Sequence, residues 1–77
     1  MNNALSIHLE MPPALANALQ RELRERLRMA VQELWYADEF RLIPDGFRAG
    51  AILTAYPALA AQKKTLGALQ AAIKEQA

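Results

Sequence analysis

The residues whose side chains could act in catalysis lie close together in the sequence near the N-terminus. Ser6, His8 and Glu10 supply a nucleophile, a base and an acid at alternate positions of one short segment. If that segment is a strand, their backbone positions lie ~6.5–7 Å apart on one face. A catalytic triad needs near-contact hydrogen bonds and usually draws its members from separate elements. We therefore predict a solvated strand face here, no catalytic residue, and a protein that is not an enzyme.

Metal and cofactor sites lack their usual residues. His8 is the only histidine and there is no cysteine, so a transition-metal site would need carboxylates or a second subunit's histidine. The acidic residues Asp38, Glu39 and Asp45 do not have the alternating spacing of a calcium loop. The three glycines are isolated and form no phosphate-binding loop. The sequence predicts no metal ligand, no cofactor and no small-molecule substrate.

One group of residues is typical of binding surfaces. When the long helical segment is projected at about 100° per residue, three arginines and a tryptophan fall on one stripe beside the leucines, and a tyrosine falls on the opposite side. These residues are Arg21, Arg24, Arg28, Trp35 and Tyr36. Arginine, tryptophan and tyrosine are enriched at the energetic centres of protein interfaces. We predict that these five residues contact a protein partner.

Two other roles for the same residues stay open. The aromatic side chains could instead fill the small core together with Phe40 and Phe47. The arginines could meet phosphates while Trp35 stacks on a base. Acidic residues are interspersed with the arginines, however, and the net charge is only +1. Nucleic acid is therefore the less favoured partner.

A strand and a long helix are expected to carry these residues. Leu5, Ile7 and Leu9 alternate with polar residues, which is the period of a strand. The Pro-Pro pair that follows suits the first turn of a helix, where a missing N–H costs nothing. No breaker then interrupts the chain for more than twenty residues. The pattern predicts one helix over residues 14–36.

The second half of the chain begins with the strongest turn signal. Pro-Asp-Gly at residues 44–46 predicts a tight turn in which Gly46 adopts a positive φ. After it, residues 47–56 have the pattern of a short helix that Pro57 ends or kinks. Residues 58–76 have the pattern of a last helix. We expect both helices to pack back against the long one.

Two leucine stripes suggest self-association. The stripe of the long helix consists of Leu15, Leu19, Leu23, Leu27, Val31 and Leu34. The stripe of the last helix consists of Leu59, Leu66, Leu69 and Ile73, with alanines beside it that allow another helix to approach closely. A chain this short buries only on the order of 60% of its unfolded surface. We predict that the last stripe is partly a seam between two copies of a homodimer.

Composition limits the class of protein. The 77 residues suffice for one small domain, 1–77. With 53% hydrophobic and 22% charged residues, the composition is that of a folded chain rather than a disordered one. We find no signal-peptide pattern and no uncharged run long enough to span a bilayer. The expectation is a small soluble cytoplasmic protein without a membrane segment.

The segment from Ser6 to Leu15 resembles the start of ribbon–helix–helix regulators, in which an alternating strand runs into a helix that begins with proline. The likeness covers roughly the first fifth of the chain. The first helix of that family is short, whereas here the helical pattern continues past Leu34. The resemblance implies a small DNA-binding transcriptional regulator that would use the arginine stripe.

The fold class predicted from these patterns is mainly α. It has a long N-terminal helix, a Pro-Asp-Gly turn, two shorter helices packed back on it, and one short N-terminal strand. That strand needs a partner in residues 40–43, in its own copy, or in another protein's sheet edge. We expect a non-enzymatic binding or regulatory module that acts through a helical protein–protein interface, and a DNA-binding regulator is the second hypothesis.

Overall fold

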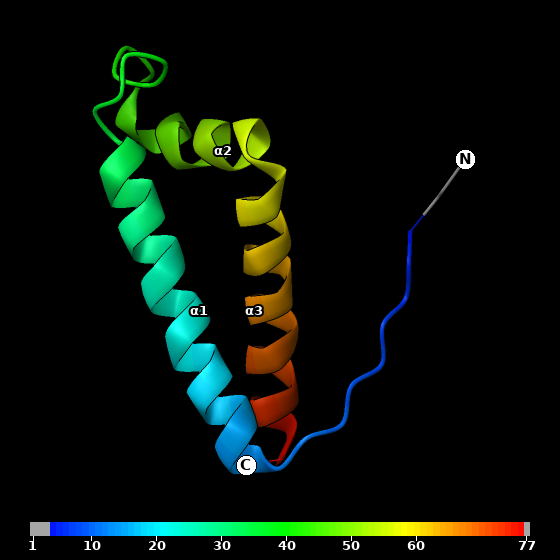
Figure 1. Cartoon of the computed structure of the whole chain (residues 1–77). Coiled ribbons are helices and arrows are strands. Elements are labelled where there is room, and N and C mark those ends of the chain that lie inside the picture. Colours follow the sequence, from blue (N-terminus) through cyan, green and yellow to red (C-terminus); the bar gives the residue numbers. More distant parts are fainter. Residues whose placement is uncertain (1–3, 77) are drawn as a thin grey trace.

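The computed structural model describes residues 4–76, and its regular elements are three helices (Figure 1). They are α1 (Pro13–Leu34), α2 (Asp45–Ala55) and α3 (Pro57–Gln76). Helices α1 and α3 run antiparallel as two legs, and α2 crosses between them at one end. We call residues 35–56 the elbow. The mainly helical prediction is confirmed, although α3 is nearly as long as α1.

Helix α1 begins where its prolines require. Pro12 has the extended φ of −58° and ψ of 146°, and its carbonyl accepts hydrogen bonds from the N–H groups of Leu15 and Ala16 at 3.0 and 3.1 Å. Pro13 then occupies the first helical position, where it has no N–H to leave unpaired. The helix ends at Leu34. Trp35, the C-cap residue of α1, is therefore the first residue of the elbow.

The predicted turn at Gly46 is wrong. Pro44 is the N-cap of α2, Asp45 begins the helix, and Gly46 lies in its first turn without a positive φ. Proline before an acidic residue suits a helix start as well as a turn, because the carboxylate faces the positive end of the helix dipole. The chain instead leaves the direction of α1 earlier, through turns at residues 35–43 that lead into α2.

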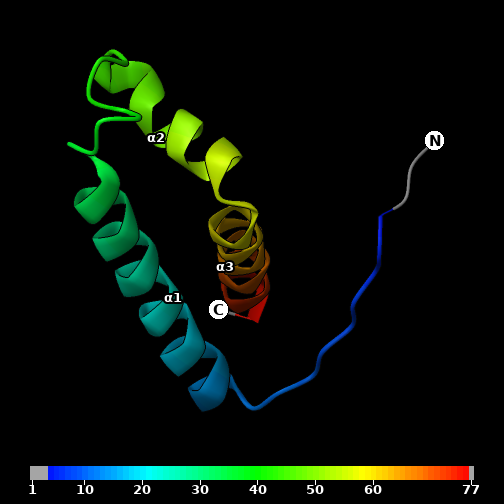
Figure 2. The ribbon, with the colours of Figure 1, turned by 45° about the horizontal axis from the view of Figure 1, so that its top comes forward.

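The predicted N-terminal strand is not seen. Residues 4–12, which we call the arm, are extended but belong to no strand within the described residues, and they lead away from the helices (Figures 1 and 2). Residues 40–43, offered as one pairing partner, form turns stabilised by hydrogen bonds such as Phe40 N–H to the Ala37 carbonyl at 2.9 Å. A strand without a partner gains no ladder hydrogen bonds. The alternation of residues 5–10 is present in the sequence, but no strand within the described residues pairs with them.

Burial is concentrated at the elbow. Phe40 is 4% exposed, Ile52 is fully buried and Arg48 is 7% exposed. The ring of Phe40 packs at an angle on that of Tyr56, with centroids 6.2 Å apart. Neither α1 nor α3 has a fully buried residue. The core of the chain is therefore a small cluster at one end of the legs.

The legs form a single layer. The chain measures 42 × 33 × 17 Å, and its thinnest dimension is less than the roughly 20 Å that two stacked helices with their side chains need. The leucines of both stripes are half-buried, apart from Leu15, which is 59% exposed. Each leg covers one side of the other's stripe and leaves the rest to solvent.

Candidate partner-binding groove

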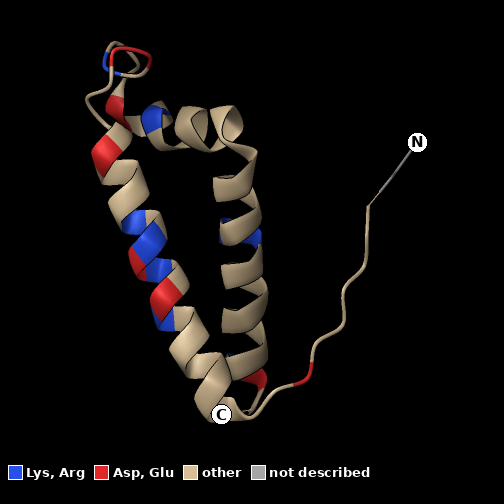
Figure 3. Cartoon of the chain, in the orientation of Figure 1, with Lys and Arg blue, Asp and Glu red and all other residues tan. Residues whose placement is uncertain are grey.

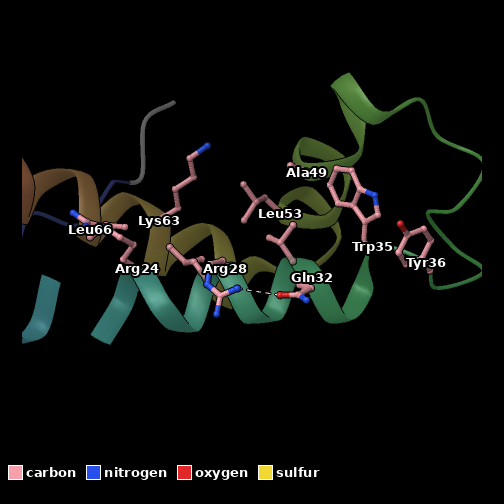
Figure 4. Close-up of a pocket in the computed structure, with 11 residues that line it drawn as sticks. Arg24, Arg28, Gln32, Trp35, Tyr36, Ala49, Leu53, Lys63 and Leu66 are labelled. Carbon is pink, nitrogen blue, oxygen red and sulfur yellow. Dashed lines mark hydrogen bonds between the residues drawn. The ribbon is translucent and has the colours of Figure 1, made fainter. Parts of the chain in front are cut away.

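A groove of about 670 Å³ opens between the legs beneath α2. Its walls come from all three helices, as the close-up in Figure 4 shows. From α1 and the residues after it come Arg24, Leu27, Arg28, Val31, Gln32, Trp35 and Tyr36; from α2 come Ala49 and Leu53; from α3 come Lys63 and Leu66. The floor is apolar and the rim carries positive charge.

The structure brings together four of the five predicted contact residues. Arg24, Arg28, Trp35 and Tyr36 line the groove, whereas Arg21 lies one turn nearer the start of α1 and does not. Tyr36 is 79% exposed, so it does not fill the core. That these residues bind a partner stays a prediction.

Arg28 is the arginine of the groove rim whose guanidinium is held by neighbouring side chains of α1. Its guanidinium forms a two-bonded pair with the carboxylate of Glu25, with Nε donating to Oε2 at 3.1 Å, and also donates to Gln32 Oε1 at 3.1 Å. The hydrogen bond to Arg28 holds the pKa of Glu25 below its ordinary value, and the same bond raises the pKa of Arg28. Arg28 therefore remains charged while its donors are already engaged along α1.

Arg24 and Lys63 differ from Arg28. Neither makes an ion pair with any residue of 4–76, and they face the groove from opposite legs. Figure 3 shows the charged residues crowded on the middle of α1 and around the elbow, with few on α3. The groove thus offers two unpaired positive charges above a hydrophobic floor.

The sequence interpretation missed Arg48, which holds the elbow together. Its guanidinium donates to the Ile43 carbonyl at 2.8 and 3.0 Å, to the Arg41 carbonyl at 2.9 Å and to the Trp35 carbonyl at 3.3 Å. The guanidinium carbon also lies 4.9 Å from the centre of the Trp35 ring, a cation–π arrangement. Arg48 thereby fixes Trp35 at the end of the groove.

A weak signal for Arg48 existed in the sequence. It is the only charged residue of α2 after the first position, between Phe47 and Ala49 in an otherwise apolar or small segment. An arginine in such a setting needs acceptors, and its planar fork can serve several carbonyls at once. Asp45, with Oδ1 3.4 Å from Arg48 Nη2, is 83% exposed and adds little to its binding.

Among the described residues, Ser6, His8 and Glu10 do not come together as a triad, and no metal-ligating cluster is present. His8 Nε2 and Glu10 Oε1 are 3.1 Å apart, but both side chains are almost fully exposed, and Ser6 makes no hydrogen bond to either. No cluster of three or more His, Asp or Glu side chains occurs within residues 4–76. None of the three helices, over their described lengths, is long and apolar enough to cross a membrane. A cytoplasmic location stays a prediction.

No protein-family model, curated protein or solved structure matches this chain. A functional conclusion must therefore rest on the structure itself, namely on the groove, the exposed arm and the half-buried stripes.

Proposed function

We propose that the protein is a non-enzymatic binding module that associates with a second copy of itself through the open face of α1 and α3. The half-buried leucine stripes support this proposal most directly. Every residue of the two stripes keeps part of its side chain in water, and Leu15 is 59% exposed. The arm adds the exposed apolar side chains of Leu5, Ile7 and Leu9. Burial of apolar surface is the main favourable term in most protein association.

The leucine stripes indicate which surface is covered. Leu27 and Val31 of α1 and Leu66 of α3 are half-buried and line the groove. Two antiparallel helices can cover only part of each other's apolar stripe, so apolar side chains of a second copy can complete the core. A second copy laid on the open face would remove these side chains from water.

Self-association is tested by the mass of the full chain in solution, measured by light scattering or sedimentation over a range of concentrations. The variant is Leu66→Asp in the groove, and Ala71→Asp on the exposed side of the same helix is its control. We expect a dimer for the wild type and for Ala71→Asp, and a loss of mass for Leu66→Asp because its carboxylate would be buried. A wild-type monomer at high protein concentration would refute the proposal.

A DNA-binding regulator is the second candidate, and the unpaired Arg24 and Lys63 are the observation in its favour. Glu22 and Glu25 beside the arginines oppose it, because they repel the phosphate backbone. A fluorescence anisotropy titration with duplex DNA at several salt concentrations decides the matter. We expect no submicromolar binding at physiological salt. Strong binding with a steep salt dependence, lost when Arg21, Arg24 and Arg28 are all replaced by Gln, would favour this candidate instead.

A further inference from the structure

The arm carries three of the most exposed hydrophobic side chains of the chain. Leu5 is 84% exposed, Ile7 is 74% exposed and Leu9 is 69% exposed. In an extended segment these alternate residues project to one side, and Ser6, His8 and Glu10 project to the other, so with the apolar side on the groove floor Glu10 faces outward at the level of the rim. Figure 1 shows the arm leaving the start of α1 without covering either leg. An apolar edge of this kind lacks its binding surface within residues 4–76.

The groove matches this edge in length. From Arg24 to Trp35 the groove follows α1 for about 17 Å, at the helical rise per residue. From Leu5 to Glu10 an extended chain covers about 17 Å as well. The apolar residues Leu5 to Leu9 cover about 13 Å of this length, and Glu10 reaches the remaining end of the groove.

The groove also matches the arm in charge. Arg24 and Lys63 lie on the rim without ion-pair partners in residues 4–76, at the end of the groove farther from Trp35. Glu10 is the acidic residue of the arm, and within the described residues it pairs only with the exposed His8, a contact that contributes little. With Glu10 at this rim, Leu5 falls at the Trp35 end. The charges thus select one direction for the arm.

We propose that the groove of each chain receives residues 5–10 of a second copy, with Glu10 beside Arg24 and Lys63 and Leu5 beside Trp35 and Ala49. This proposal rests on the proposed self-association and names the element that mediates it. Two arms exchanged in this way make a closed, two-fold interface in which each chain both gives and receives.

The chain's own arm cannot take this position. Along α1, Trp35 lies about 33 Å from Pro13. The eight residues from Pro13 back to Leu5 span at most about 29 Å when fully extended. Leu5 therefore falls short of the Trp35 end of its own groove even before the chain reverses direction. The arm that fills the groove must come from another molecule.

The exchange is tested by cross-linking, which the absence of cysteine makes clean. A Leu5→Cys chain is co-expressed with an Ala49→Cys chain that carries a size tag, and the dimer is treated with a short bismaleimide. The control pairs Leu5→Cys with Ala71→Cys, an equally exposed alanine outside the groove. We expect the cross-link between the two different chains for Ala49→Cys and a much weaker one for Ala71→Cys.

Other cross-linking results would overturn the exchange. Products that join two Leu5→Cys chains would mean that the arms pair with each other. A cross-link within one chain of the Leu5→Cys, Ala49→Cys double variant would mean that the arm folds back. A dimer that Leu66→Asp dissociates but that gives no product between Leu5→Cys and Ala49→Cys refutes the exchange alone. A monomer at all concentrations refutes both the exchange and the proposed function.

A second pair of variants measures the contribution of the apolar edge. Ile7→Asp places a charge on the edge, and Ser6→Asp places the same charge on the other side of the arm. We expect Ile7→Asp to raise the dimer dissociation constant by about tenfold or more, and Ser6→Asp to change it by less than about threefold. Equal effects of the two variants would contradict an arm that binds by one side.

Discussion

The elbow and the legs of this protein are stabilised by different means. At the elbow the Arg48 guanidinium satisfies the carbonyls of Trp35, Arg41 and Ile43, and Ile52 is fully buried. In the legs no side chain is fully buried, and the buried Oε1 of Gln62 has no hydrogen-bond partner within the described residues. An unsatisfied buried acceptor costs free energy. The elbow is therefore closely packed and its buried donors are satisfied, whereas the legs leave their apolar stripes half-buried and one buried acceptor without a partner in the described residues.

Substitution of Ile52 is expected to give the largest difference in stability between the elbow and the legs. Replacing Ile52 by Ala should lower the free energy of unfolding by about 3 kcal/mol, because the cavity would lie in the one cluster of buried side chains among residues 4–76. Leu69→Ala in the half-buried stripe of α3 should cost less in dilute solution, and its cost should grow with protein concentration. Urea unfolding at two concentrations measures both. Equal, concentration-independent losses would mean that the legs are as complete as the elbow.

Arg48 is expected to show the next largest effect. Arg48→Met should lower the free energy of unfolding by about 2 kcal/mol, since three carbonyls lose their donor. Arg48→Lys should recover only part of this, because an ammonium lacks the planar fork. Trp35 is the only tryptophan, so its fluorescence reports the change directly. Arg41→Met, an exposed position, is the control and should change stability by less than about 0.5 kcal/mol. A fully stable Arg48→Met variant with unchanged Trp35 emission would contradict this role.

Gly46 gives a smaller effect of the opposite sign. The position is helical, and a Cβ built on it meets nothing within 4 Å. Gly46→Ala should therefore raise the unfolding free energy by about 0.5 kcal/mol, through a less disordered unfolded chain. Thermal unfolding measures the difference. If Gly46→Ala destabilised the protein, Gly46 would have the positive φ of the tight turn that the Pro-Asp-Gly pattern predicted.

The smallest effect concerns the Glu25–Arg28 pair. The folded-state pKa of Glu25 is lowered by its hydrogen bond with Arg28, so the contribution of this pair is present above the ordinary pKa of 4.5 and is lost as the pH falls through the lowered value. Both side chains are more than half exposed to solvent, which screens the pair, so Glu25→Gln should lower the melting temperature only slightly at neutral pH. In acid well below the ordinary pKa the two proteins should melt together. A difference that persists in acid would show that the pair acts through something other than charge.

The sequence predicted the legs well because their signals are local. The Pro-Pro pair, the leucine spacing and Pro57 are readable one segment at a time, and they place α1 and α3 within one or two residues. The same spacing placed Arg24, Arg28 and Trp35 on one side of a helix, which α2 and α3 then turn into a groove. The periodicity of apolar residues is enough to predict a helix and the residues that share one of its faces.

The elbow could not be predicted in the same way. Arg48 acquires its role from carbonyls up to thirteen residues away, and no local pattern announces which carbonyls will be left to it. Gly46 failed for a related reason, since Pro-Asp begins both turns and helices. The strand failed because alternation specifies a side-chain direction but supplies no neighbouring backbone. In each case the outcome depended on a contact rather than on a pattern.

The position of Arg48 has a consequence for the order of folding. Its hydrogen bonds close loops of at most thirteen residues, whereas bringing the far ends of α1 and α3 together closes almost the whole chain. The entropy lost on closing a loop increases with its length, so we expect the elbow to form first and the legs to come together from that end outward. The angle at which they meet, and hence the width of the groove, is then fixed early, by one guanidinium and the backbone around it.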